Sequence, residues 1–180
     1  MVNKACYFYD YNITDRCIIK NSEIQCCDNP CAYYEVVSAS PLFLNKMDTL
    51  HRNASRVKKE EGFDDIVIHS TALYFVSKNA DGDEVNISSE EFAKIVQAWY
   101  KNDVPNIRLI ACSSGAFPDG AAQQLSNILG VKVKAPLGPV VVDFDGNMHV
   151  EDAITGVILN EKSAWRIFEP KMKGENNNDK

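Results

Sequence analysis

The sequence predicts an α/β fold with a mostly parallel central sheet flanked by helices. Two apolar runs, at 64–70 and 106–112, are rich in Ile, Leu and Val, and each stops abruptly at small polar residues. Such runs are typical of strands buried on both faces of a parallel sheet. A helical pattern at 88–99 lies between them, so the three segments form a βαβ unit, in which the strands are almost always parallel. The chain of 180 residues is long enough for one such domain with an N-terminal extension.

The first 60 residues are predicted to be a cysteine-rich, antiparallel β-strand extension followed by a helix over 41–60. Five of the six cysteines lie in the first 31 residues: Cys6, Cys17, Cys26, Cys27 and Cys31. An odd number cannot pair completely within itself, so two disulfides plus a free thiol and five reduced thiols both stay open. We favour reduced thiols, because free cysteine often behaves as a small buried hydrophobic residue. The cluster has no nearby His and no common zinc spacing, so we expect no metal and no other cofactor.

Residues 61–170 are predicted to form the α/β domain itself. After a strand ending near residue 70, we expect a helix capped by Ser88 and Glu91 and a second helix over 119–129 that ends at Gly130. A strand at 131–135, a hairpin about Asp145-Gly146 and a last strand at 165–168 should follow. The polar segment 171–180 is expected to be a disordered tail.

The charge and hydropathy of the chain exclude several classes of partner. A net charge of -6 argues against a nucleic-acid or anionic-membrane surface, which would need a basic field. No apolar run approaches the roughly 20 residues of a membrane span, and the N-terminus carries no signal-peptide core. We therefore expect a cytoplasmic protein, or one that is secreted or delivered without a classical signal peptide.

The two apolar runs end in residues that can do chemistry together. His69 closes the first run, and Cys112 closes the second. If the strands are parallel neighbours, both side chains emerge at the same edge of the sheet, where open α/β sheets bind ligands. An imidazole beside a thiol can take its proton and make a nucleophilic thiolate. The backbone N–H groups of Cys112 and Ser70 would then be placed to stabilise an oxyanion.

The other histidines offer one rival arrangement. His149-Val150-Glu151 is a His-x-Glu that follows a strand-end cysteine in the chain, which is the order used by glutamine amidotransferases. Against it, Ile110 stands where such enzymes have a glycine before the nucleophile, and His149 follows a tight turn, which predicts an outward-facing hairpin residue. His51 lies on a polar helical face, and we expect it to be solvated.

Several of these segments resemble a known family. Ile-Val-Ile-His-Ser at 66–70, the segment 85–95 and Arg-Leu-Ile-Ala-Cys-Ser-Ser-Gly at 108–115 resemble the caspase-like (clan CD) cysteine peptidases, which include the self-processing domains of large bacterial toxins. Segments at 121–125, 130–136, 145–146 and 165–170 are similar to C-terminal domains of bacterial polymorphic toxins. The resemblance covers about 64–170. It implies a three-layer caspase-like sandwich, a dyad of His69 and Cys112, and hydrolysis of peptide bonds.

Two features depart from the family pattern. The family usually has His-Gly where this chain has His69-Ser70, and glycine lets a substrate approach the backbone closely. The basic cluster that binds inositol phosphate in the toxin domains is not matched, because the basic residues here are scattered. These residues are Lys132, Lys134, Lys162 and Arg166.

The sequence thus predicts a cysteine-dependent hydrolase, a peptidase acting as a bacterial toxin or effector domain. The resemblance implies a peptide or protein substrate and an immunity or activator protein as partners. His69 and Cys112 are the predicted catalytic residues, and Ser70, Ser113 and Gly115 are expected to contact the oxyanion or the substrate. The alternatives are an inactive binding module on the same fold and a different α/β thiol amidohydrolase.

Overall fold

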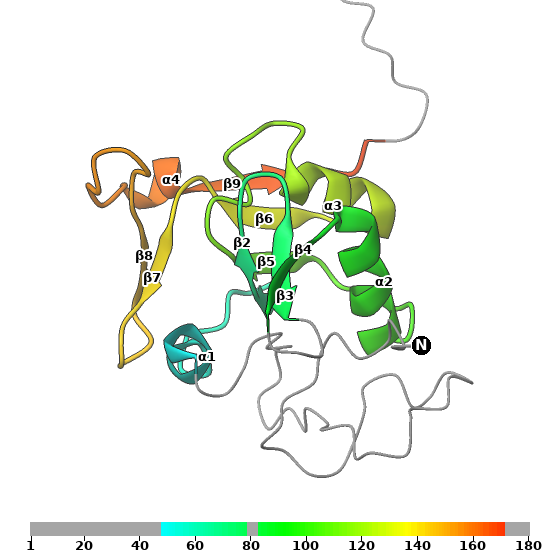
Figure 1. The fold of residues 1–180 in the computed structure, drawn as a ribbon, viewed down its shortest axis with the longest axis horizontal. Helices are drawn as coiled ribbons and strands as arrows, with labels where there is room; N and C mark the ends of the chain where they lie inside the picture. Colours follow the sequence, from blue (N-terminus) through cyan, green and yellow to red (C-terminus); the bar gives the residue numbers. More distant parts are fainter. Residues whose placement is uncertain (1–47, 79–82, 172–180) are drawn as a thin grey trace, which may run out of the picture.

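The protein is described here by a computed structural model covering residues 48–78 and 83–171. Its centre is a four-stranded sheet in the order β1-β5-β6-β9 (Figure 1). The strands are β1 (Asp64–Val67), β5 (Ile107–Ile110), β6 (Val133–Pro136) and β9 (Trp165–Phe168). β1, β5 and β6 are parallel, and β9 runs antiparallel to β6. The predicted α/β class, with a mostly parallel sheet packed against helices, is confirmed.

One face of the sheet is covered by α2 (Ser89–Trp99) and α3 (Ala121–Leu129), which also pack against each other (Figure 1). The predicted capping box is present, because the Ser88 hydroxyl accepts from the Glu91 N–H and the Glu91 carboxylate accepts from the Ser88 N–H. Gly130 ends α3 with a left-handed φ of 71°, as predicted. The first core fills the space between these helices and the sheet. Its largest fully buried members include Phe75, Phe92, Ile66, Ile68, Ile107, Leu109 and Leu125.

The opposite face carries a second, smaller core. It is covered by α1 (Thr49–Ala54), by the antiparallel hairpin of β7 (Val140–Val142) and β8 (Met148–Val150), and by α4 (Glu161–Ala164). Figure 1 shows α1 and this hairpin on the side of the sheet away from α2 and α3. The hairpin turns at Gly146, which has a φ of 86°, so the predicted hairpin about Asp145-Gly146 is confirmed.

A small antiparallel sheet follows the first parallel strand. It consists of β2 (His69–Ser70), β3 (Phe75–Lys78) and β4 (Glu84–Ile87). The run at 64–70, predicted as one strand, is therefore divided between β1 in the parallel sheet and β2 in this one. β4 was not predicted, although its alternating exposure, with Ile87 buried and Glu84 exposed, is the period-2 pattern of a half-buried strand.

The helix predicted over 41–60 is wrong at Asp48, which is an extended N-cap, and in its C-terminal part, while residues 41–47 lie outside the described ranges. α1 ends at Ala54, and residues 55–60 leave the helix to follow the sheet surface. The physical reason is tertiary, because the Lys58 carbonyl and the Glu60 carboxylate both accept from Arg108 on β5. Gly62, which could have been read as the glycine ending this helix, has a left-handed φ of 80° but lies in a turn eight residues after α1. Residues 48–60 thus pack on the same sheet as the predicted domain.

Several predictions fall on residues outside the described ranges. They are the antiparallel extension, the state of Cys6, Cys17, Cys26, Cys27 and Cys31, and the tail after Lys171. Among the helices described, none has both the length and the apolar character needed to cross a membrane.

Candidate active site

His69 and Cys112 follow two neighbouring parallel strands. The register of β1 and β5 pairs Val67 with Ile110, so His69 and Cys112 both come two residues after that last pair. The Ile68 N–H donates to the Ile110 carbonyl at 3.4 Å. This bond keeps the two segments side by side just beyond the ends of β1 and β5. The adjacency and parallel direction predicted for these segments are confirmed.

The two side chains also share one face of the sheet. Side chains alternate along extended backbone, so His69 lies on the face of Val67, and Cys112 lies on the face of Ile110. Val67 and Ile110 both belong to the second core, and Cys112 packs against that core. The predicted nucleophile and its predicted base therefore occupy matching positions, two residues beyond the last pair of β1 and β5.

The imidazole of His69 is held by a carboxylate that the sequence reasoning missed. Nε2 of His69 lies 2.7 Å from Oδ2 of Asp48. Asp48 is the N-cap of α1, and its other oxygen, Oδ1, accepts from the Leu50 N–H at 2.8 Å. The His69 side chain is 39% exposed, so it remains open to solvent.

The thiol of Cys112 is free, half-buried and contacted by backbone. Its Sγ accepts from the Val140 N–H at 3.4 Å and lies 3.9 Å from the Val140 carbonyl oxygen. The sulfur thus has one backbone donor and one backbone acceptor of Val140 in contact with it. Within residues 48–78 and 83–171, the thiol and the imidazole of His69 share no hydrogen bond.

The two backbone N–H groups predicted to stabilise an oxyanion are those of Cys112 and Ser70. Among the described hydrogen bonds, the Cys112 N–H donates none. The Thr71 N–H donates to the Tyr74 carbonyl, and the next pair along the hairpin is Ser70 with Phe75. Because hydrogen-bonded and non-bonded pairs alternate in an antiparallel ladder, the Ser70 N–H points away from β3. An oxyanion site needs N–H groups that are not used for pairing within the fold.

The other two predicted contact residues have occupied N–H groups. The Ser113 N–H donates to the Gly138 carbonyl, and the Gly115 N–H donates to the Pro136 carbonyl, both at 2.9 Å. Ser113 also has a left-handed φ of 57°, which turns the chain sharply after Cys112. A Cβ at Gly115 would lie 2.8 Å from the Ala135 carbonyl oxygen, so this glycine is required by close packing of the loop on β6.

The rival histidine lies on a different surface. His149 is on β8 opposite Val141, and its Nε2 is 3.2 Å from Oε1 of Glu151. By alternation, it lies on the face of the hairpin away from Val150, which belongs to the second core. The side chain of His51 falls outside the part of the chain that is described.

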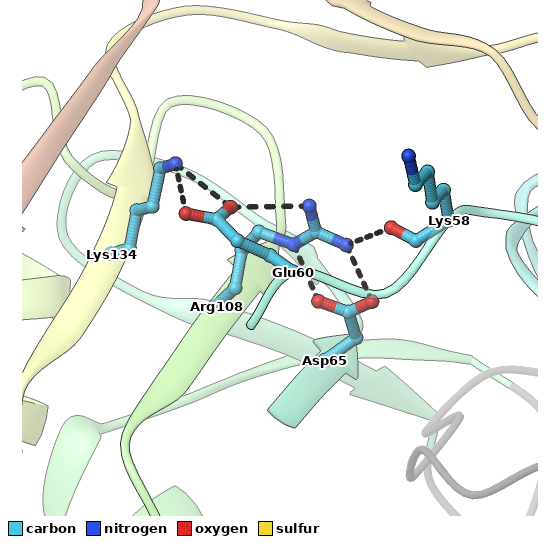
Figure 2. Close-up of polar contacts among 5 residues, drawn as sticks. All are labelled: Lys58, Glu60, Asp65, Arg108 and Lys134. Carbon is cyan, nitrogen blue, oxygen red and sulfur yellow. Dashed lines mark hydrogen bonds and ion pairs between the residues drawn. The ribbon is translucent and has the colours of Figure 1, made fainter. Parts of the chain in front are cut away.

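A buried ion-pair network joins β1, β5 and β6 on the face of the sheet that carries His69 and Cys112. Figure 2 shows Arg108 of β5 between Asp65 of β1 and Glu60, while Glu60 also binds Lys134 of β6. Arg108 Nη2 is 2.6 Å from Asp65 Oδ2, and both residues are about nine-tenths buried or more, at 6% and 5% exposed. Burial disfavours the charged guanidinium, but the bonds to Asp65 and then to Glu60 outweigh it and raise the pKa of Arg108. The network fixes the relative positions of the strands that lead to His69 and Cys112.

The sequence contains only a weak signal for the role of Asp48. Asp before a helix is a favoured N-cap, so the Asp48-Thr49 step could have marked the start of α1. Nothing local indicates that this cap meets His69, 21 residues away. Among the described residues, no three His, Cys, Asp or Glu side chains gather closely enough to hold a metal ion.

Comparison with known proteins identifies a family but no function. No curated protein matches the chain. Residues 39–150, more than half of the chain and the part that contains Asp48, His69 and Cys112, match the family described as Domain of unknown function (DUF8616), and the chain therefore belongs to that family.

Proposed function

We propose that the protein is a cysteine-dependent hydrolase, a peptidase in which Cys112 is the nucleophile and His69 its acid-base partner. The observation that carries this proposal is the placement of the two residues, which follow parallel neighbouring strands in register and lie on one face of the sheet. The carboxyl edge of such a sheet is where α/β proteins bind their ligands. The free thiol of Cys112, half-buried beside the second core, adds support.

The chemistry follows from these groups. His69 takes the proton of the Cys112 thiol, and the thiolate sulfur bonds to the substrate carbonyl carbon. The N–H groups of Cys112 and Ser70 stabilise the oxyanion of the tetrahedral intermediate. The C–N bond then breaks, and the imidazolium gives its proton to the leaving amine. Water hydrolyses the thioester and restores the thiol. Catalytic hydrogen bonds are often long in a free enzyme, so the imidazole and thiol are expected to meet when substrate binds.

A more specific part of the proposal is that the domain has the caspase-like fold and peptidase activity. It is supported by the resemblance at 66–70 and 108–115 and by the parallel sheet that carries these segments. The role as a bacterial toxin or effector, with an immunity or activator protein as partner and delivery without a classical signal peptide, rests on the resemblance to polymorphic toxin domains.

A binding module is the second candidate, and a specific observation favours it. The thiol contacts the Val140 backbone and the imidazole contacts Asp48, while Ser70 stands where the resembling family has glycine. A domain that had lost turnover would tolerate all three features. The two candidates differ in whether Cys112 reacts.

Labelling with a peptide-based electrophile that modifies thiolates tests the choice between them. We expect selective labelling of Cys112 over the other five cysteines, located by peptide mass mapping, and loss of labelling in Cys112→Ala. Proteome-derived peptide libraries then reveal cleavage, which His69→Ala should slow by about 10²-fold or more, the usual contribution of a general acid-base group.

His149→Ala is the matched control, and it should leave cleavage unchanged. Loss of turnover in His149→Ala but not in His69→Ala would favour the amidohydrolase alternative. No selective labelling together with no cleavage would favour the binding module.

A further inference from the structure

The carboxylate of Asp48 bridges a helix end and the imidazole of His69. One oxygen, Oδ1, accepts from the Leu50 N–H at 2.8 Å, and the other, Oδ2, is 2.7 Å from Nε2 of His69. An ionised carboxylate only accepts hydrogen bonds. Nε2 must therefore be the protonated nitrogen of a neutral imidazole, and Nδ1 is left as the basic one.

The helix that begins at Asp48, α1, is hydrogen-bonded to strand β7. Asn53, in the last turn of α1, donates from Nδ2 to the Val142 carbonyl at 2.7 Å and is 8% exposed. Ala54 is part of the second core. β7, which receives the Asn53 bond at Val142, also places the Val140 N–H on the sulfur of Cys112. One strand thus holds both the helix that orients the imidazole and the thiol.

We propose that Asp48 is a positioning residue that fixes His69 in the tautomer protonated at Nε2, so that Nδ1 is the atom that accepts the proton of Cys112. The catalytic consequence rests on the proposed function, whereas the tautomer itself does not. Asp48 acts through His69 and makes no contact with a substrate in this role. The pairing extends the His–Cys dyad to three residues, with the third supplied by a helix N-cap.

Asp48→Asn changes the tautomer without removing the cap. Asn is an N-cap as good as Asp, and its carbonyl oxygen can keep the Leu50 N–H. Its amide nitrogen, a donor, then faces Nε2 of His69, which must become the acceptor. The variant should therefore invert the tautomer and leave α1 intact. Asp48→Ser is the matched control, because Ser also caps a helix but is too short to reach the imidazole.

Nitrogen NMR of the full chain reads the tautomer directly. The chain has three histidines, so His51→Gln and His149→Gln assign the His69 signals. We expect protonated Nε2 in the wild type, protonated Nδ1 in Asp48→Asn and a mixture in Asp48→Ser, with equal thermal stability of the two variants. Cleavage or Cys112 labelling should fall by about 10²-fold in Asp48→Asn, and by less in Asp48→Ser.

The outcomes separate the two proposals. Protonated Nδ1 in the wild type, or the same tautomer in all three proteins, would overturn the role of Asp48 while leaving the hydrolase proposal to its own test. The expected tautomers in a protein with no cleavage and no reactive Cys112 would support Asp48 and reject the hydrolase. Expected tautomers with unchanged cleavage in Asp48→Asn would show that Nδ1 is not the base, and would also overturn the inference.

Discussion

The Ser70 hydroxyl donates a hydrogen bond of 2.7 Å to the carbonyl oxygen of Cys112. It ties the residue after the proposed base to the proposed nucleophile, across the gap between β2 and the loop that follows β5. The caspase-like pattern has glycine at this position, and glycine has no hydroxyl to make such a bond. The departure from the pattern therefore has a structural role in this protein.

Removal of this bond should loosen the two strand ends. Ser70→Ala is expected to lower the free energy of unfolding by about 0.5–1.5 kcal/mol, the net value of one hydrogen bond. Chemical denaturation measures the change. The exposed Ser55, whose hydroxyl donates to the Arg52 carbonyl within one turn, is the control, and Ser55→Ala should cost less than about 0.5 kcal/mol. Equal effects of the two substitutions would show that the Ser70 tie adds no stability.

Relief of the strained turn after Cys112 should stabilise the fold. Ser113 has a φ of 57°, a region that costs a non-glycine residue on the order of 1 kcal/mol. Glycine adopts it freely but loses more conformational entropy on folding, so Ser113→Gly should raise the free energy of unfolding by about 0.5 kcal/mol. Denaturant titration reads the change.

Ser114, the next residue, provides the control, because its replacement by glycine should lower the free energy of unfolding. Ser114 is fully buried, and its hydroxyl donates to the Ala111 carbonyl at 2.9 Å. Ser114→Gly should therefore destabilise the protein by about 1 kcal/mol or more. A loss of stability in Ser113→Gly as well would contradict the proposed strain.

Loss of the buried guanidinium should be the most damaging of these changes. Arg108→Met leaves the carboxylate of Asp65 buried without its bidentate partner, and removal of one member of a buried pair costs about 3–5 kcal/mol. The exposed pair of Lys171 and Asp119 is the control, and Lys171→Met should cost about 0–1 kcal/mol. Arg108→Met with Asp65→Leu should recover part of the loss, because no charge is then left unpaired. Denaturant unfolding of the three variants tests this order.

The free energy of unfolding should fall at alkaline pH, because the folded state resists the ionisation of Tyr100. Burial, followed by the charge and hydrogen bond of Asp64 at 3.3 Å, raises the pKa of this phenol above its ordinary value of 10.0. Because the folded pKa lies above the unfolded one, the folded state binds more protons above about pH 10, so stability is present below that pH and is lost as pH rises. Tyr100→Phe should flatten this decline, as followed by unfolding free energies from pH 8 to about 11. A decline of the same steepness in the variant would reject the assignment to Tyr100.

The sequence was most informative where the determining interactions are local. The capping box of Ser88 and Glu91, the left-handed Gly130 and the Asp145-Gly146 turn each depend on residues a few positions apart, and all three are present. The parallel neighbours β1 and β5 were predictable because an apolar run, a helix and a second apolar run leave few topologies open.

The failures arose where distant parts of the chain decide local structure. Residues 55–60 have helical periodicity but leave α1 because Glu60 and the Lys58 carbonyl bind Arg108. The run at 64–70 divides because His69 and Ser70 pair with β3 rather than continuing along β5.

By itself, the sequence determined the α/β class, the order of most elements and the placement of His69 and Cys112 just after two adjacent parallel strands. Only the tertiary structure decided that Asp48 meets His69, that Val140 meets the sulfur and that Ser70 holds the Cys112 carbonyl. The physical reason is that burial patterns are periodic and visible along the chain. The hydrogen bonds between these side chains and remote backbone depend on how α1 and β7 pack on the sheet, which no local pattern records.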